Sequence, residues 1–349
     1  MERFRDDAWA AWWRDVCAGL DAGAAPAGAC YVARGGEVLC QAVHGHATLL
    51  PEPEPLTERH RFDLASVSKP VAGATCALVL WQDGRLPLDA PLGDSAPALF
   101  AADHRHAHLT PTELLTHQSG LPTHLQFYRE CRTREELCAA ILATPADRPP
   151  REAVVYSDLG FMLLGFALES IAGQGLDTLF ETRVTEPAGL AGELSYGPIP
   201  AASAVATEDC PWRGRVARGE VHDENCFVAD GVTAHAGLFG TAPAVGRFAQ
   251  KLMAGEVLGA EAMAELFKVR GDVAGDRFWL GWQRTDYGSG DPRCFSHDGF
   301  TGTLVFCSPR EELVVVLLTN RVHPTRDNRL IYDYRPGWFQ AAVALAIQA

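Results

Sequence analysis

Ser66 and Lys69 stand three residues apart in the stretch "FDLASVSKPVAGATCALVLWQDGRL", which occupies positions 62–86. A serine hydroxyl is a poor nucleophile unless a neighbouring base takes its proton. A lysine can be that base when burial and nearby cations depress its pKa, whereas an arginine cannot lose its proton in a protein. Only three of the thirty basic residues are lysines. A lysine at position 69 therefore indicates chemistry that the arginine favoured elsewhere in the chain cannot perform.

The residues that follow Ser66 predict a helix over about 67–82. Pro70 is tolerable only in the first turn, where its missing N–H would have no partner, so Ser66 lies at or next to the N-cap. Residues three apart on a helix share a face, which lets the Lys69 ammonium lie beside the Ser66 hydroxyl. The alternative is a capping serine followed by an ordinary surface lysine. Because S-x-x-K is short enough to arise by chance, it needs support from the rest of the chain.

Support comes from two polar triplets further along the chain. The stretch "VVYSDLGFMLLG" places Tyr-Ser-Asp at 156–158, just before an apolar helical run, and "CFSHDGFTGTLVF" places His-Asp-Gly at 297–299, at the edge of a strand. In order and broad spacing, the three motifs resemble those of the serine β-lactamase and penicillin-binding-protein superfamily. The stretches "FDLASVSK", "LLTHQSGLP", "YSDLGFMLLG" and "HDGFTGT" are each similar to stretches of that family, so the resemblance covers roughly residues 25–345.

The resemblance implies an acyl-enzyme mechanism with a role for each reacting group. Ser66 would be the nucleophile and Lys69 its proton acceptor. Tyr156 would shuttle a proton between the serine and the leaving group. The backbone N–H groups of Ser66 and Phe300 would form an oxyanion hole, where one lost donor typically costs ~3 kcal/mol of transition-state stabilisation.

Residues of the second and third triplets would bind substrate in the same scheme. These are Asp158, His297, Asp298 and Gly299. Gly299 has a physical reason of its own, because without a Cβ the strand edge can approach a substrate backbone closely. Asp158 departs from the family pattern, in which asparagine usually offers an amide donor. His297 stands where many members carry lysine or another histidine, and histidine is common among the esterase-like and other non-lactamase members. Both departures weigh against an efficient β-lactamase and favour an amidase, a carboxypeptidase or an esterase.

The polar block "GEVHDENCFVADGVTAHAGLFGTAPAVGRFA" at 219–248 is a further candidate. Together with "LLTNRVHPTRDN", it resembles a branch of small serine hydrolases that includes amidases of muropeptide recycling and D-alanyl carboxypeptidases. Its side chains at 222–225 could line the cleft, or could only cap and brace a structural loop, and both interpretations stay open. These side chains are His222, Asp223, Glu224 and Asn225. We expect His117 and His235 to brace loops rather than take part in chemistry.

Strand patterns stand at both ends of the chain, with helical patterns between them. After an amphipathic helix near the start, "GACYVARGGEVLCQAVHGHAT" predicts a hairpin that turns at Gly35 and Gly36. "RFWLGWQRT" predicts a strand, "GTLVFCSPREELVVVLLTN" predicts two strands joined at 308–311, and "WFQAAVALAIQA" predicts a closing helix. We therefore expect an α+β fold: an antiparallel sheet domain flanked by terminal helices (1–85 and 205–349), a mostly helical insert (86–204), and the active site between them.

The composition limits the partners of the protein. The 349 residues are 47% hydrophobic and carry a formal net charge of −14. No basic stretch is dense enough to follow nucleic-acid phosphates, and no run approaches the ~18 apolar residues of a membrane span. The first residues lack the apolar core of a secretion signal, and the ten cysteines show no zinc-binding spacing. We expect a cytoplasmic enzyme, without cofactor or metal, that acts on a small molecule or a short peptide or muropeptide. Its oligomeric state is left open.

Two rival functions remain open. A binding or sensor module on the same fold would be acylated once without turnover, or not acylated at all. A metallohydrolase would use the alternating histidines of "DHRHAHL", which are His104, His106 and His108. No acid or cysteine cluster completes that site in the sequence, so a solvated loop is the simpler interpretation. Tyr332 and Tyr334 could reach the cleft, but nothing in the sequence distinguishes them from packing residues.

Overall fold

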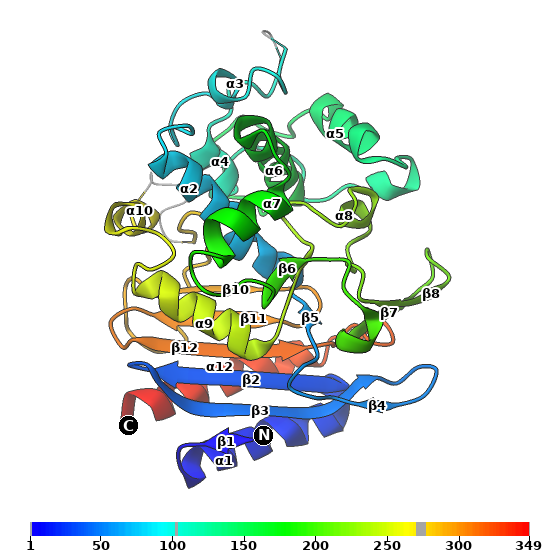
Figure 1. Cartoon of the computed structure of the whole chain (residues 1–349), viewed down its shortest axis with the longest axis vertical. Helices are drawn as coiled ribbons and strands as arrows, with labels where there is room; N and C mark the ends of the chain where they lie inside the picture. The colour runs from blue at the N-terminus through cyan, green and yellow to red at the C-terminus, as the bar shows by residue number, and fades with distance from the viewer. Residues whose placement is uncertain (1, 102–103, 270–276, 349) are drawn as a thin grey trace.

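The computed structural model describes residues 2–101, 104–269 and 277–348. Its largest sheet takes strands from both ends of the chain in the order β1-β3-β2-β12-β11-β10, with β4 paired to β3 (Figure 1). The strands are β1 (Arg3–Phe4), β2 (Ala27–Arg34), β3 (Glu37–Thr48), β4 (Glu54–Pro55), β10 (Phe295–Asp298), β11 (Leu304–Ser308) and β12 (Leu313–Thr319). Strand β12 joins the two ends of the chain, because it pairs antiparallel with β2 on one side and with β11 on the other.

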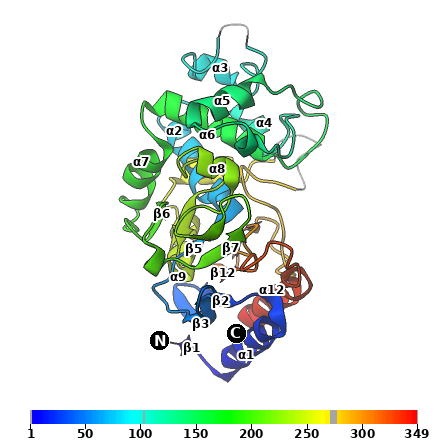
Figure 2. The same ribbon diagram turned by 90° about the vertical axis from the view of Figure 1, so that its right-hand side faces the viewer.

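Three helices cover the two faces of this sheet. They are α1 (Asp7–Gly19), α12 (Ile331–Gln348) and α9 (Ala242–Met253). Helices α1 and α12 lie side by side, and the indole N–H of Trp12 donates to the carbonyl of Trp338 at 2.9 Å (Figure 2). Val315 and Leu317 of β12 belong to the core under these two helices, while Val314, Val316 and Leu318 belong to the core that includes α9. The alternation of a β-strand thus gives the sheet two buried faces.

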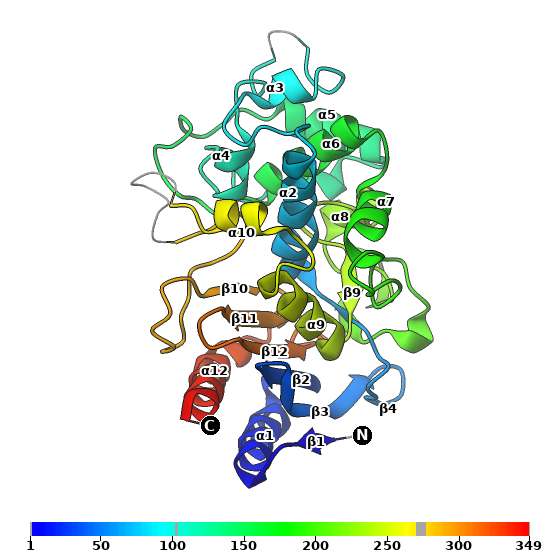
Figure 3. The same cartoon turned by 60° about the vertical axis from the view of Figure 1, so that its left-hand side comes forward.

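A lobe of short helices stands beyond the β10 edge of the sheet (Figures 1 and 3). Its helices are α2 (Thr75–Gln82), α3 (Leu92–Ser95), α4 (Pro111–Leu115), α5 (Arg134–Ala143), α6 (Asp158–Ala172), α7 (Leu176–Phe180), α8 (Glu224–Val228) and α10 (Ala260–Leu266). Two small sheets complete it: β5 (Phe62–Asp63), β9 (Leu238–Gly240) and β6 (Leu194–Tyr196) form one, and β7 (Ala206–Cys210) and β8 (Arg215–Arg218) the other. Helix α6 is buried along most of its length and packs against α2, α4 and α5.

The expected α+β fold is confirmed, as are the hairpin at 35–36 and the strand pair joined near 308–311. The strand expected over 277–285 is wrong. The described residues there make only isolated bridges, because the chain turns at Gly281, where φ is +76° and the Trp279 N–H bonds the Trp282 carbonyl at 2.8 Å. The closing helix begins at Ile331, before the expected "WFQAAVALAIQA" run. The domain boundaries at 85/86 and 204/205 stay a prediction.

In the described part of the chain, no single helix has the length and apolar character needed to cross a membrane. The bent pair formed by α6 and the segment Leu176–Thr185 meets that criterion only when both parts are counted together.

Candidate active site

Ser66 and Lys69 lie where a helical segment begins, and their side chains touch. A 3₁₀ turn over Ala65–Val67 and a π-helical turn over Lys69–Ala74 precede α2, so the expected helix is present but starts with irregular turns. Lys69 Nζ lies 2.9 Å from Ser66 Oγ. The lysine side chain is fully buried, while Ser66 lines a cavity. Residues three apart have therefore brought a nucleophile and an amine into hydrogen-bond contact.

The turn before Ser66 is strained and held in place. Ala65 has φ +47°, a left-handed conformation that costs a residue with a side chain of order 1–3 kcal/mol. Asp63 supports it, because its Oδ1 accepts the Ala65 N–H at 2.8 Å and its Oδ2 accepts the His222 N–H at 2.6 Å. The buried Asp63 carboxylate thus fixes the position from which Ser66 faces the cavity.

Asp158 is the second partner of Lys69. Its Oδ1 lies 2.7 Å from Lys69 Nζ, and its Oδ2 lies 3.5 Å from Nδ1 of His124. Burial is the largest single influence and would lower the pKa of Lys69, but the charge of Asp158, the neighbouring Tyr156 and the hydrogen bonds to both together outweigh it and hold that pKa above its ordinary value. The depressed pKa that the sequence suggested for Lys69 is therefore wrong, because the sequence did not reveal its ion pair with Asp158. In the free protein, Lys69 is a paired ammonium.

Tyr156 covers the other side of this amine. Lys69 Nζ lies 4.6 Å from the centre of the Tyr156 ring. Burial raises the pKa of the phenol, while the Lys69 charge and hydrogen bonding to Lys69 and Ser66 oppose that rise. The His117 ring packs 4.5 Å from the Tyr156 ring, and its Nδ1 accepts the Ser157 N–H at 3.1 Å. His117 thus has the bracing contacts expected of it.

His297 is fully buried behind Tyr156 and does not line the cavity. Its Nδ1 lies 2.8 Å from the carbonyl oxygen of Asp298, which requires a proton on Nδ1. Burial and the Lys69 charge lower the pKa of His297 to about 4, so the ring is neutral near pH 7 and leaves Nε2 as an acceptor. A lysine at this position would carry a positive charge, and His297 does not.

Gly299 lies against the turn that carries the nucleophile. A Cβ there would come within 2.2 Å of Thr303 Oγ1 and 2.6 Å of the Leu64 carbonyl oxygen. The hydroxyls of Thr301 and Thr303 donate to the carbonyls of Asp63 and Leu64 at 2.8 and 2.9 Å. The close approach that we expected of Gly299 is thus made to the protein's own backbone, and it holds the segment after β10 next to Ser66.

The cavity in front of these residues has a volume of about 480 Å³. Of the residues that the motifs singled out, the cavity is lined by Ser66, Tyr156, Asp158, Asp298 and Phe300. Lys69, His297 and Gly299 stand behind its wall. Asp298 is tied down on both oxygens, by Gln283 Nε2 at 3.0 Å and by Arg335 at 3.0 Å. The motif residues therefore divide into a surface that can touch substrate and a buried layer that supports it.

The block at 222–225 contributes three of its four residues to the cavity wall. His222 stacks on the Phe300 ring at 5.7 Å, and Asp223 and Glu224 line the cavity beside it. His235 also lines the cavity, and its Nε2 lies 3.1 Å from Asp223 Oδ1, so it combines a bracing contact with a place in the wall. Its charge and hydrogen bond offset burial and lower the pKa of Asp223 to about 2. Asn225 is buried elsewhere. It bonds the Leu125 carbonyl and the Tyr128 N–H, so it braces a loop.

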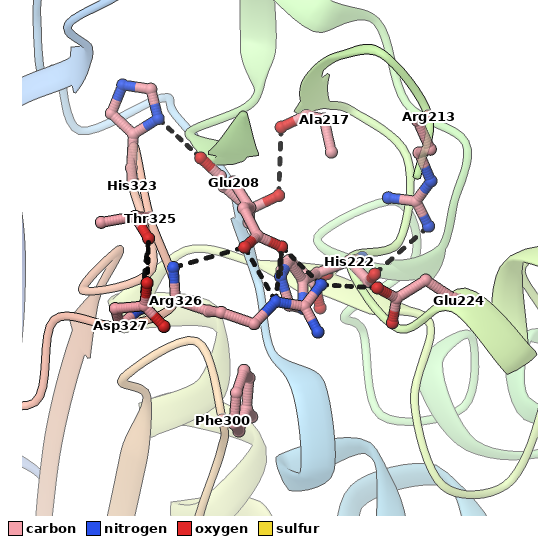
Figure 4. A network of polar contacts seen from close by, with 12 residues as sticks. Glu208, Arg213, Ala217, His222, Glu224, Phe300, His323, Thr325, Arg326 and Asp327 are labelled. Atoms are coloured by element: carbon pink, nitrogen blue, oxygen red, sulfur yellow. Dashed lines mark hydrogen bonds and ion pairs between the residues drawn. The ribbon is translucent and has the colours of Figure 1, made fainter. Parts of the chain in front are cut away.

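Several lining residues were missed by sequence reasoning. They are His124, Gln283 and Arg326. Tyr332 also lines the cavity, whereas Tyr334 stacks on Trp338 of α12 at 5.4 Å. Arg326 lies between two carboxylates: it bonds both oxygens of Glu208, and its NH2 reaches Glu224 Oε1 at 2.5 Å (Figure 4). Only the stretch "LLTNRVHPTRDN" hinted at Arg326, and its charge partners lie about a hundred positions earlier in the chain.

The three alternating histidines do not form a common site in the described residues. His106 is buried, with Nε2 2.8 Å from the Thr144 carbonyl oxygen, so the solvated loop expected there is wrong at this position. The described ranges hold one group whose atoms are close enough to bind a metal ion together, namely Glu208, Cys210 and Glu224. Arg326 already pairs with both of those carboxylates, and its permanent charge disfavours a cation between them.

The sheet built from both termini, the helical lobe and the Ser66–Lys69 pair define a protein of the β-lactamase fold. The chain belongs to the Beta-lactamase family, whose model matches residues 13–335. It is 28% identical over 359 residues to an N-acetylmuramyl-L-alanine amidase of Bacillus subtilis, covering 89% of this chain and 79% of the relative.

Two further proteins are similar to this chain, one in sequence and one in structure. A protein of Escherichia coli K12 that is provisionally described as a D-alanyl-D-alanine carboxypeptidase is 26% identical over 315 residues, covering 79% of this chain and 73% of the relative. The crystal structure of a family VIII carboxylesterase superposes with a TM-score of 0.76 at 19% identity, covering 99% of each chain. At that identity, the likeness to the carboxylesterase shows the fold alone.

Proposed function

We propose that the protein is a serine hydrolase that forms an acyl-enzyme at Ser66 and then hydrolyses it. The substrate is an amide or an ester, such as a muropeptide, a D-amino-acid peptide or a small ester. The observation that carries this proposal is the contact of 2.9 Å between Ser66 Oγ and Lys69 Nζ at the wall of a cavity. A nucleophile beside a base that a third group orients is the arrangement typical of covalent catalysis.

In this mechanism, the proton of Ser66 passes to the deprotonated form of Lys69 as Oγ attacks the carbonyl carbon. Asp158 sets how much of that form exists, because its charge favours the ammonium. The Tyr156 hydroxyl gives its proton to the leaving group as the bond to the carbonyl carbon breaks. In the second half, water attacks the acyl group and returns a proton to the Tyr156 oxygen. Lys69 then gives its proton back to Ser66, so the enzyme ends as it began.

The negative charge of the tetrahedral intermediate needs donors that are already in place. The backbone N–H groups of Ser66 and Phe300 are our candidates, since both residues line the cavity and the threonine contacts hold their segments together. Preorganised donors of this kind cost no reorganisation at the moment of reaction. Phe300 is 47% exposed, so its ring also offers the substrate an apolar surface.

The amidase among the similar proteins supports an amide as the bond type, and small esters are included because an acyl-enzyme at a serine forms from either. The neutral His297 and the carboxylate of Asp158 argue against efficient β-lactam hydrolysis, because neither supplies the donor or the positive charge that the resemblance associates with lactamases. We therefore propose that β-lactams are poorer substrates than amides of cell-wall fragments and small esters.

The test is turnover by the parent and the Ser66→Ala protein. Both are assayed against p-nitrophenyl acetate, N-acetylmuramoyl-L-alanine, a D-alanyl-D-alanine peptide and penicillin. We expect the parent to hydrolyse at least one of the first three and the variant to lose that activity by about 10³-fold or more, as removal of a nucleophile does. Equal hydrolysis by both proteins would overturn the assignment of Ser66. A single burst of product without turnover would favour the alternative function, a binding or sensor module that is acylated only once.

A further inference from the structure

A second cavity, of about 610 Å³, adjoins the catalytic one. The two share Glu224 and Arg326 in their walls, so one extended substrate could lie in both. The second cavity lies between the 3₁₀ turn Phe127–Arg129, the tip of the β7–β8 hairpin and the segment around Thr325. Its walls at the hairpin and at the 3₁₀ turn lie outside the stretches singled out in the sequence.

Trp212 is the most distinctive side chain of this second cavity. It stands at the tip of the hairpin and remains 40% exposed, which is unusual for so large an apolar group. Its ring is nevertheless fixed, by edge contacts with Tyr128 at 5.1 Å and with Phe227 at 5.9 Å. An exposed aromatic face that its neighbours hold rigid loses little conformational entropy when a ligand packs on it.

The hairpin tip is also tied to the catalytic cavity. The guanidinium of Arg213 lies 4.5 Å from the centre of the Phe227 ring, and its NH2 donates to the carbonyl of His222 at 3.2 Å. His222 in turn stacks on Phe300 beside Ser66. Trp212 is therefore held at a defined position relative to the nucleophile.

Polar groups surround the aromatic face. Five residues with polar side chains line the cavity around Trp212, namely Gln126, Arg129, Asp209, Thr325 and Asp327. A ligand that fits this surface needs one apolar face for the indole and several hydroxyl or amide groups around its rim. A pyranose ring has that form, because its axial C–H groups carry partial positive charge and suit the negative face of an aromatic ring.

The partition between the cavities is a fixed charge cluster. Arg326 bonds Glu208 at 2.8 Å through Nε and reaches Glu224 at 2.5 Å, while His222 Nε2 lies 3.1 Å from Glu208 (Figure 4). Burial would raise the pKa of Glu208, but His222 and Arg326 lower it to about 2, so Glu208 is ionised near neutral pH. A linker that crosses the partition meets charged groups that can hydrogen-bond an amide.

We propose that the cavity at Trp212 binds a sugar ring of the substrate, while the bond to be cleaved lies at Ser66. This inference rests on the proposed function and narrows it to glycan-bearing amides or esters. Trp212 stacks on the sugar, the polar rim bonds its hydroxyl and N-acetyl groups, and Arg326 and Glu224 contact the connecting chain.

Binding is tested first, in protein that carries Ser66→Ala so that no turnover intervenes. N-acetylmuramic acid and, separately, N-acetylmuramoyl-L-alanine are titrated by calorimetry into this protein and into the same protein with Trp212→Ala. We expect the added substitution to weaken binding of both ligands about ten-fold, which corresponds to ~1.4 kcal/mol. Tyr334→Ala removes an equally exposed aromatic ring from the remote helix α12 and should leave both affinities unchanged. Unchanged affinity in the Trp212→Ala protein overturns the proposal.

Kinetics then separate failure of this proposal from failure of the proposed function. In otherwise unmodified protein, Trp212→Ala should raise KM for N-acetylmuramoyl-L-alanine about ten-fold and leave kcat/KM for p-nitrophenyl acetate unchanged, because the acetate has no sugar. An equal loss on both substrates would show a general structural defect and contradict the subsite. Asp327→Ala removes an exposed carboxylate from the rim of the same cavity. It should raise KM for N-acetylmuramoyl-L-alanine and leave the kinetics on p-nitrophenyl acetate unchanged. This second variant tests the subsite even if the Trp212→Ala protein fails to fold. If the parent hydrolyses neither the amide nor the ester in a Ser66-dependent way, the proposed function itself is refuted.

Discussion

Two charge clusters, one around Lys69 and one around Arg326, border the catalytic cavity. Lys69 is fully buried and has one carboxylate partner, Asp158, at 2.7 Å. Arg326 is 35% exposed and has two, Glu208 and Glu224. The difference follows from chemistry: a lysine can release a proton when its surroundings change, whereas an arginine keeps its charge and bonds carboxylates with a rigid fork. The lysine therefore occupies the position where a proton is transferred, and the arginine occupies the position where a fixed charge holds the cavity wall together.

We expect the largest loss of activity when the lysine of the first cluster is replaced by arginine. We expect Lys69→Arg to reduce kcat/KM on p-nitrophenyl acetate by about 10²–10⁴-fold, the range of general-base contributions, because the guanidinium cannot take the Ser66 proton. Lys251→Arg changes a partly exposed lysine that pairs with Glu256 and serves as the matched control. An active Lys69→Arg enzyme would remove lysine from the role of base.

A substitution that shifts the turn carrying Ser66 tests whether catalysis depends on the tight packing around this residue. Gly299→Ala should lower the free energy of unfolding by ~1–3 kcal/mol, as overpacking does, and reduce kcat, since the added Cβ presses on Thr303 and the Leu64 carbonyl next to Ser66. Thermal unfolding and steady-state kinetics measure both effects. Gly337→Ala is the control, because a Cβ at that helical position meets no atom within 4 Å. Equal behaviour of the two variants would contradict the packing argument.

Asp158→Asn should change the pH dependence of kcat/KM. The Asp158 charge raises the pKa of Lys69, and without it burial remains as the opposing influence, so that pKa falls. If neutral Lys69 is required, kcat/KM rises with pH through this pKa, and the midpoint of that rise should move to lower pH in the variant. A pH–rate profile measures it. An unmoved midpoint would show that Lys69 is not the titrating base.

Arg326→Lys should have the smallest effect. Lysine keeps the positive charge but loses the forked contact with Glu208 and Glu224. We expect KM for N-acetylmuramoyl-L-alanine to rise a few-fold and kcat for p-nitrophenyl acetate to stay the same. A loss of kcat as large as that of Lys69→Arg would mean that the two clusters do not have separate roles.

Spacing along the chain predicted the contact of Ser66 with Lys69, and the motif resemblance supplied Tyr156, Asp158 and Phe300, but neither revealed the contacts between distant residues. Ser66 and Lys69 meet because they are three residues apart, and the fold class followed from strand patterns at both ends of the chain. The ion pair of Lys69 joins residues 89 positions apart, and it reversed the expected direction of the lysine pKa. Gly281 shows the same limit in the fold, since an apolar run that suggested a strand is turned by one left-handed glycine.

His124, Gln283 and Arg326 reach the cavity from three separate segments, and of these only Arg326 lies in a stretch that the sequence resemblance singled out. Their positions follow from the way the lobe packs on the sheet edge, which local patterns do not encode. Trp212 belongs to the same class, because its exposure becomes informative only once Tyr128 and Phe227 are seen to hold it. Long-range packing therefore decides the parts of the site that select the substrate.

The location of the acyl group tests the account most directly. The protein is mixed with p-nitrophenyl acetate, quenched in acid within the first turnovers, digested and mapped by mass spectrometry. We predict one added acetyl group, on the peptide that contains Ser66, and none on that peptide in the Ser66→Ala protein. An acetyl group confined to another residue, or steady hydrolysis with no acylated peptide at any quench time, would contradict the account.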